Sequence, residues 1–177
     1  QKAPENPSVK LVVDGNAALG KGRLEEAEKL FKDALVASPG MMGARIGLAA
    51  CRYERGDLKG TRQLVGEALK EDGRNAQALG LLGLVHWRSG ELADAEDVLE
   101  DAIKQDKEDS QLRNYLGIVL YERKKFDPAV SSLRKSVELD PSNAEARYNL
   151  AVVLAMSQRP QLDEARGRWL ELVAHAG

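Results

Sequence analysis

The glycine-rich segment Gly15–Gly22 has the spacing of a known chemical motif. Its sequence, Gly-Asn-Ala-Ala-Leu-Gly-Lys-Gly, comes after the apolar run Leu11-Val12-Val13 and Asp14, and it mimics the phosphate-binding pattern G-x-x-x-x-G-K-S/T. Gly22 stands where that pattern needs a hydroxyl group to bind Mg²⁺. Gly15 and Gly22 also belong to a periodic pattern that places the segment in a helix, whereas a phosphate loop follows a strand. We therefore predict that this segment does not bind a nucleotide.

The chain offers few other residues for metal binding or nucleophilic catalysis. Its one cysteine, Cys51, excludes an internal disulfide and a thiolate zinc cluster, and its two histidines, His86 and His175, exclude a three-histidine site. We expect Cys51 to be an inert buried thiol and His86 to be packed with one hydrogen-bond partner. No H-E-x-x-H or G-x-S-x-G signature is present. We predict that the protein is not an enzyme and has no catalytic residues, no metal and no cofactor.

Composition and charge exclude further classes. The 177 residues are 43% apolar and 31% charged, which suits one soluble domain or a short repeat array. A net charge of −2 and an aromatic content of 5% give no basic patch or stacking surface, so we expect no nucleic-acid partner. No apolar run approaches the ~20 residues that span a bilayer, so we expect no membrane insertion. We expect a soluble protein, in either the cytoplasm or the periplasm.

Two charged clusters have an ordinary interpretation as solvated surface. We predict that Arg123-Lys124-Lys125 is a solvated turn. The acidic cluster is expected to be a solvated helix face, with an acidic docking surface as the alternative; its residues are Glu91, Asp94, Glu96, Asp97, Glu100 and Asp101.

The elements that position these residues follow from an internal repeat with a period of about 34 residues. Six columns keep this period, one of which is Leu48, Leu82, Leu116 and Leu150. Each repeat carries two apolar patterns with steps of three and four, and in the first three repeats a glycine at 22, 56 or 90 separates them. This predicts two helices joined by a tight turn. The repeats are 8–41, 42–75, 76–109, 110–143 and 144–177, after a loose leader at 1–7.

These repeats resemble the tetratricopeptide repeat (TPR) family over about 170 residues. The resemblance is carried by the run Ala144–Ala151 (AEARYNLA), the exit Glu138–Pro141 (ELDP) and an alanine column in the second helix. It implies an all-α fold, a right-handed α-solenoid of antiparallel helix pairs. It also implies a non-catalytic scaffold that binds proteins or peptides. The sequence departs from the family at Asp14, at Gly73 and Lys107 in place of the exit proline, and by two extra residues near 158–161.

The family usually binds partners on the inner wall formed by the first helix of each pair. We take positions two, five, nine and twelve of each repeat as inner, because these steps keep to one helix face. Of these twenty residues only Glu145 is charged, although the chain average predicts about six. An apolar or uncharged peptide segment is therefore the expected ligand. The predicted binding residues are Asn16, Tyr53, Gly80, Trp87, Arg88, Asn114, Tyr121 and Tyr148.

Other features of the inner wall qualify this prediction. Relatives that hold a C-terminal carboxylate have asparagine and basic residues where this chain has Gly47, Gln77 and Leu81, so we expect no carboxylate clamp. Gly43, Gly47 and Gly80 weaken a helix, which close approach of a ligand would explain. The alternative for the aromatic column Tyr53, Trp87 and Tyr121 is packing alone.

The last helix predicts an uncovered apolar flank at Trp169, Leu170, Leu172 and Val173. Helical repeats hide such a face only against a neighbour. We expect either that the chain continues in a longer protein or that a second copy covers this end in a homodimer. Two alternative functions remain: an assembly module of a bacterial envelope or secretion complex, and a regulatory domain of a larger enzyme.

Overall fold

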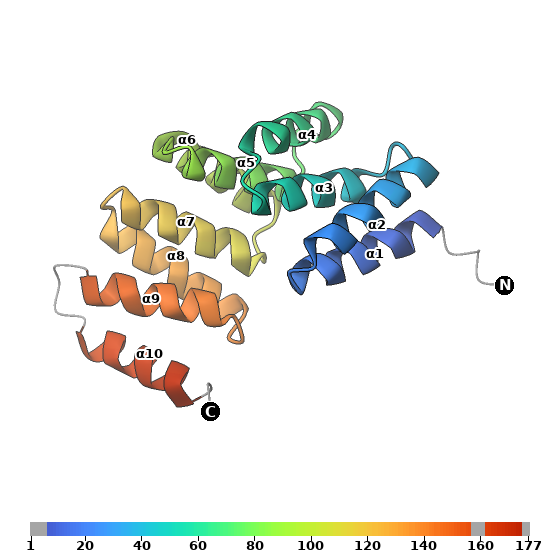
Figure 1. Cartoon of the computed structure of the whole chain (residues 1–177). Coiled ribbons are helices and arrows are strands. Elements are labelled where there is room, and N and C mark those ends of the chain that lie inside the picture. Colours follow the sequence, from blue (N-terminus) through green and yellow to red (C-terminus); the bar gives the residue numbers. More distant parts are fainter. Residues whose placement is uncertain (1–6, 157–161, 175–177) are drawn as a thin grey trace. The chain divides into compact units, whose positions relative to one another are not determined.

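The computed structural model describes residues 7–156 and 162–174, and all regular structure in these two ranges is α-helical. The predicted all-α fold is confirmed, with ten helices in consecutive pairs in this part of the chain (Figure 1). The helices are α1 (Pro7–Gly20), α2 (Leu24–Ala37), α3 (Met42–Glu54), α4 (Leu58–Glu71), α5 (Ala76–Arg88), α6 (Leu92–Gln105), α7 (Ser110–Glu122), α8 (Phe126–Leu139), α9 (Ala144–Met156) and α10 (Leu162–Ala174).

The helix starts keep the repeat length read from the sequence. The first helices of the later pairs begin at positions 42, 76, 110 and 144, which are the predicted repeat starts. α10 begins at position 162, whereas the same period counted from the start of α8 at 126 would place it at 160. The extra residues predicted near 158–161 lie outside the described residues, as do 1–6 of the predicted leader. Pro7 begins α1, where its fixed φ suits the first helical position.

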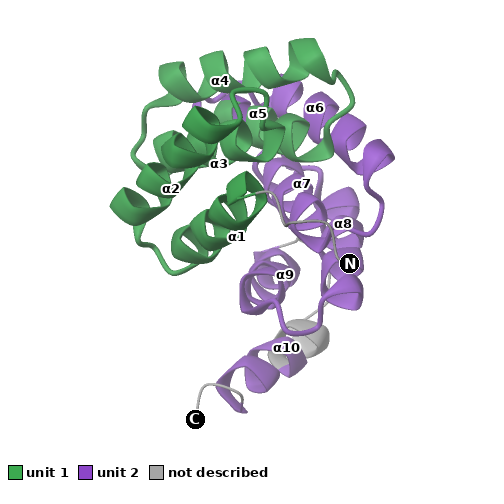
Figure 2. Ribbon diagram, turned by 90° about the vertical axis from the view of Figure 1, so that its right-hand side faces the viewer, with its two compact units in different colours: residues 1–85 green, residues 86–177 purple. Residues whose placement is uncertain are grey.

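The chain divides into two compact units, and the division falls within α5 (Figure 2). Unit 1 is Gln1–Val85 and holds α1 to α4 with most of α5; unit 2 is His86–Gly177 and holds the last residues of α5 with α6 to α10. Within unit 1, α1 packs on α2 and α3, and α3 packs on α2 and α4. Within unit 2, each helix from α6 to α10 packs on the next, and α7 also packs on α9. The single array at 8–177 stays a prediction.

The core of unit 1 is built around the ring of Phe31. This side chain of α2 is 0% exposed. A Cβ atom at Gly15 of α1 would lie 2.6 Å from the ring, and one at Gly47 of α3 would lie 2.3 Å from it. The two glycines therefore make room for the ring between their helices.

This packing explains two of the helical glycines differently from the sequence analysis. Gly47 admits the Phe31 ring, and a Cβ at Gly43 would meet Val12 at 3.3 Å, so both lie against unit 1 itself. The prediction that they admit a ligand is replaced by close packing between helices. Gly15 likewise lies inside α1 against Phe31, so the motif-like segment begins as helix and not as a phosphate loop.

In unit 2, leucines of the paired helices fill the space between them. Leu133 of α8 is fully buried, and a Cβ at Gly117 of α7 would lie 2.5 Å from its Cγ atom. Leu150 and Leu154 of α9 are also 0% exposed. The small residue of one sequence column thus lies opposite a large one on the paired helix, which is how close-packed helices interlock.

Polar side chains cap the first helices of the last three pairs, α5, α7 and α9. The side-chain oxygens of Asn75, Asp109 and Asn143 accept hydrogen bonds from the backbone N–H three residues onward, at 3.0, 3.1 and 3.0 Å. These bonds satisfy donors that a helix start leaves without a partner. The three caps occupy the same position, the last residue of successive repeats, so the residue just before each of these helices helps to specify where it starts.

The turn within each of the first three pairs uses a glycine in the left-handed region. Gly22, Gly56 and Gly90 have φ of 70°, 79° and 77°, which confirms the predicted glycine turns. The fourth pair has Lys124 at the same column, with φ of 61°. A side chain other than glycine is strained in this region because its Cβ crowds the backbone.

We expect Lys124→Gly to stabilise the protein by about 0.5–1 kcal/mol, since the relief of strain exceeds the extra entropy of the unfolded chain. The reverse change, Gly90→Ala, is expected to cost about 1 kcal/mol. Urea unfolding of both variants measures the two free energies. Loss of stability in Lys124→Gly would contradict the assignment of strain to this turn.

Candidate functional site

The eight residues predicted to bind a peptide are divided between the two units. Unit 1 holds Asn16 on α1, Tyr53 on α3 and Gly80 on α5. Asn16 is exposed, whereas Tyr53 is 5% exposed and Gly80 is buried. Of these three, Asn16 presents its side chain to solvent.

Unit 2 holds the other aromatic residues of the predicted set. Trp87 is partly buried near the end of α5, and its Nε1 donates to Glu122 Oε1 at 2.9 Å. Tyr121 is partly buried near the end of α7, with its ring centroid 6.0 Å from that of Phe126. Arg88, beside Trp87, is exposed.

Tyr148 is the most exposed of these aromatic residues. Half of its surface (50%) is accessible on α9. Its ring centroid lies 6.2 Å from that of Trp169 on α10, and Trp169 is 53% exposed. The two rings form an aromatic pair at the surface of unit 2, at a distance and tilt typical of favourable ring contacts. Leu170 and Val173 of α10, at 59% and 60%, extend the exposed apolar surface.

Asn114 has a different environment from the aromatic residues. It is 0% exposed, and its Nδ2 donates to Glu145 Oε1 at 3.1 Å. Its Oδ1 accepts from Asn149 Nδ2 at 2.9 Å. Both ends of the amide therefore bind α9, so Asn114 holds α7 to α9 and does not face solvent.

Glu145, the one charge among the inner positions, belongs to the same network. Its second oxygen accepts from Gln111 Nε2 at 3.4 Å, and Gln111 Oε1 accepts from Asn143 Nδ2 at 2.8 Å. In this network Gln111 and Asn114 belong to α7, Asn149 belongs to α9, and Asn143 directly precedes α9. The carboxylate is thus hydrogen-bonded within the protein, which lowers its demand for a charged partner.

The acidic cluster on α6 is not wholly a solvated face. Glu96 is 8% exposed, and it pairs with Arg123 and with Lys125 Nζ, the latter at 2.8 Å. The prediction that Glu96 is solvated is wrong, because this carboxylate joins α6 to the turn between α7 and α8. In that turn Lys124 and Lys125 are exposed, as predicted, whereas Arg123 is partly buried. The sequence feature that could have predicted this ion pair is the spacing of 27 residues between Glu96 and Arg123.

The same pair recurs two repeats earlier in unit 1. Arg55 pairs with Glu28, again 27 residues apart. A hydrogen bond from Lys32, together with the charge of Arg55, lowers the pKa of the Glu28 carboxyl. The repetition indicates that these acid–base pairs join neighbouring repeats.

His86 and Cys51 lie as the sequence indicated. His86 is partly buried, and its Nδ1 lies 2.5 Å from Glu91 Oε2, so the predicted packed histidine with a hydrogen-bond partner is confirmed. Cys51 is fully buried, as predicted, and burial raises the pKa of its thiol. A raised pKa lowers the thiolate fraction at neutral pH, and the thiolate is the reactive form.

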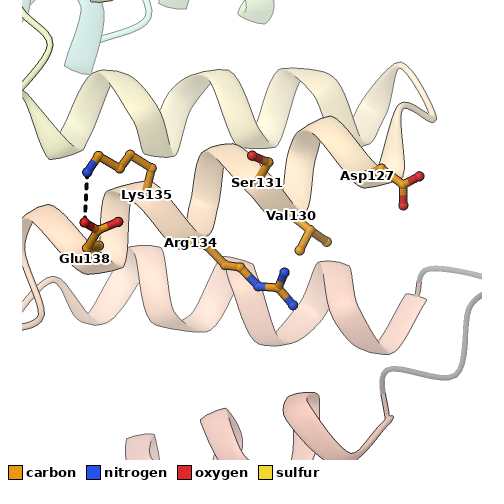
Figure 3. A pocket seen from close by; sticks show the side chains of 6 residues that line it. All are labelled: Asp127, Val130, Ser131, Arg134, Lys135 and Glu138. Carbon is orange, nitrogen blue, oxygen red and sulfur yellow. Dashed lines mark hydrogen bonds and ion pairs between the residues drawn. The ribbon is translucent and has the colours of Figure 1, made fainter.

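One hollow of about 400 Å³ lies on unit 2, and it has the character of a charged surface (Figure 3). Lys135 and Glu138, both on its wall, form an ion pair at 2.9 Å. The six lining residues all come from α8 and are Asp127, Val130, Ser131, Arg134, Lys135 and Glu138. None of these six lining residues is a histidine or a cysteine. Across residues 7–156 and 162–174, none of the helices has the length and apolarity to cross a membrane.

Sequence profiles described as tetratricopeptide repeat match the chain at residues 18–65, 62–110, 81–143 and 116–177. The chain belongs to the tetratricopeptide repeat family. Tetratricopeptide repeats are protein–protein interaction scaffolds that bind proteins or peptides and are generally non-catalytic. The recognition made from the sequence is thus confirmed, and with it the α-solenoid class of fold.

Solved structures of other TPR proteins have the same fold. A thermophilic TPR protein of Thermus thermophilus has a TM-score of 0.81 and 23% identity, covering 94% of this chain and 90% of that one. PilF of Pseudomonas aeruginosa has a TM-score of 0.77 and 24% identity, with coverage of 97% and 77%. YrrB, a TPR protein with an unusual peptide-binding site, has a TM-score of 0.62 and 22% identity, with coverage of 97% and 92%. At these identities the likeness shows the fold alone.

A curated relative matches part of the TPR array. A segment of 84 residues is 36% identical to the protein CTR9 homolog of Arabidopsis thaliana. The match covers 47% of this chain and 8% of that protein. The chain therefore spans a small fraction of that relative's length.

Proposed function

We propose that the protein is a non-catalytic scaffold that binds an apolar or uncharged peptide segment on the first helices of its pairs. The proposal keeps the predicted residues of each unit, which are Asn16, Tyr53 and Gly80 in unit 1 and Trp87, Arg88, Asn114, Tyr121 and Tyr148 in unit 2. Within unit 1 we assign the direct contact to Asn16, because Tyr53 and Gly80 are buried. Within unit 2 we assign the direct contacts to Trp87, Tyr121 and Tyr148, and we give Asn114 a positioning role because its side chain is buried.

The observation that carries the proposal is the scarcity of charge at the inner positions. Glu145 is the one charged residue among twenty, and its carboxylate is hydrogen-bonded by Gln111 and Asn114. A partner with a charged segment would have to lose hydration there without gaining an opposite charge, which is unfavourable. An apolar or uncharged segment avoids this cost.

Accessible aromatic rings are proposed to provide the favourable contacts with the peptide. Tyr148 is 50% exposed, and Trp87 and Tyr121 are partly exposed. Large rings that become buried on binding are typical of residues that dominate the binding energy of an interface. The Trp87 Nε1 donor already binds Glu122, so the indole can lose water without leaving that polar group without a partner.

Selection of a phage-displayed random peptide library on the immobilised protein tests this function. The selected peptides are expected to be apolar and low in charge. Tyr148→Ala should weaken their binding by about 1–2 kcal/mol, roughly 5- to 30-fold, as measured by calorimetry. Val36→Ala, which changes a side chain of α2 that is 83% exposed, is the matched control and should leave binding unchanged. Selection of strongly charged peptides, or equal effects of the two variants, would contradict the proposal.

A further inference from the structure

The turn between α5 and α6 brings together three side chains with metal-binding atoms. His86 lies in the last turn of α5, Glu91 immediately precedes α6, and Asp94 lies in the first turn of α6. One ligand atom of each lies within 4.8 Å of the other two. His86 is partly buried, and the two carboxylates are exposed, so an ion can reach them from solvent. All three residues belong to unit 2.

The backbone of this turn is held in place without the three side chains. Gly90 has a φ of 77°, and the backbone N–H groups of Gly90 and Glu91 donate to the carbonyls of Trp87 and His86, each at 2.9 Å. Gly56, one repeat earlier, has a φ of 79°, and its turn carries the two equivalent backbone bonds at 2.9 Å. The two turns therefore have the same backbone arrangement, and their side chains project from equivalent positions.

The earlier turn shows which side-chain contact this backbone arrangement supports when the three metal-binding residues are replaced. Arg52 and Asp57 occupy the positions of His86 and Glu91, one repeat earlier, and form an ion pair at 3.1 Å. Gly60 occupies the position of Asp94 and provides no carboxylate. An arginine does not coordinate metal ions, because its guanidinium group stays protonated. The later turn keeps a pair at the first two positions, with His86 Nδ1 at 2.5 Å from Glu91 Oε2, and it adds the carboxylate of Asp94. Replacement of the arginine by a histidine and of the glycine by an aspartate thus brings three possible metal ligands together.

We propose that His86, Glu91 and Asp94 bind a divalent transition-metal ion, with Zn²⁺ the best match. Zinc accepts one imidazole nitrogen and two carboxylate oxygens at about 2.0–2.2 Å, with water in the fourth tetrahedral position. Neutral His86 with two carboxylates balances the charge of the ion. The imidazole ligand disfavours Mg²⁺ and Ca²⁺, which prefer oxygen donors. The bound ion joins α5 to α6 beside Trp87 and has no part in the proposed peptide contacts.

Zinc titration calorimetry on the metal-free protein tests the site. The reference protein carries His175→Ala, because His175 is the only other histidine in the sequence. We expect one equivalent of Zn²⁺ to bind to the reference and to raise its melting temperature, because the ion binds the folded turn. Mg²⁺ is expected to do neither.

His86→Arg is the matched variant, since it recreates the ion pair of the earlier turn while removing the metal ligand. In the reference background it should retain the melting temperature in EDTA and lose at least ~100-fold in zinc affinity, more than the loss of an outer-shell partner causes. Asp94→Asn should weaken binding at least tenfold, and it decides the question if His86→Arg does not fold. Zinc affinity unchanged in these variants, or no saturable binding to the reference up to about 1 mM, would overturn the proposal.

Discussion

Replacing Phe31 by alanine is expected to lower the free energy of unfolding by about 3–5 kcal/mol. The ring is fully buried between the helices that carry Gly15 and Gly47. Its loss removes apolar contacts and leaves a cavity, because backbone on both sides cannot follow the shortened side chain. Urea unfolding followed by circular dichroism measures the loss. Val36→Ala, on the exposed side of the same helix, should change stability by less than about 0.5 kcal/mol.

A double-mutant cycle distinguishes this packing from a general weakness of unit 1. Gly47→Ala alone should cost about 1–3 kcal/mol, because its Cβ would lie 2.3 Å from the Phe31 ring. In the Phe31→Ala background the same change should cost much less, since the ring is gone. Additive effects of the two substitutions would contradict the assignment of Gly47 to the space around Phe31.

Asn114→Asp is expected to destabilise unit 2 by about 3–5 kcal/mol at neutral pH. The substitution keeps the shape of the side chain but places a carboxylate in a fully buried position beside Glu145. Burial and the neighbouring negative charge both disfavour its ionised form. When protonated, the new carboxyl can donate to Glu145 and accept from Asn149, so it reproduces the bonds of the amide.

The cost of Asn114→Asp should therefore depend on pH. The pKa of the introduced carboxyl is raised in the folded state above its unfolded value of about 3.9. The stability difference from the parent protein is then small below about pH 4 and grows as the pH rises toward the folded pKa. Unfolding at about pH 4 and pH 7.5 measures the difference, with Asn16→Asp on exposed α1 as the control. An equal cost at both pH values would show that charge is not its cause.

The arrangement of helices was predictable because each repeat specifies its own hairpin. The repeat columns predicted where the later first helices begin, and glycines at 22, 56 and 90 predicted the turns. Caps such as Asp109 and small residues such as Gly117 act on near neighbours in the chain. The information needed for these features is local, so a single sequence contains it.

The contacts between repeats were predicted less well, since they depend on which side chains meet across helices. Glu96 was expected to be solvated, but it meets Arg123 and Lys125 from the next pair. Asn114 was predicted as one of the binding residues, and its side chain is buried against α9. Gly47 was interpreted as room for a ligand, and Phe31 fills that room. In each case the helical spacing predicted on which side of its helix the residue lies, but it did not predict which side chain of another helix contacts it.

The salt dependence of binding is the most direct test of an uncharged peptide-binding surface. Calorimetry measures the Kd of a peptide selected from the random library at about 50 mM and about 500 mM NaCl. Because salt screens charges and leaves apolar contacts largely intact, the Kd should change less than about threefold. A loss of affinity of about tenfold or more would show that charges dominate recognition and would contradict the account.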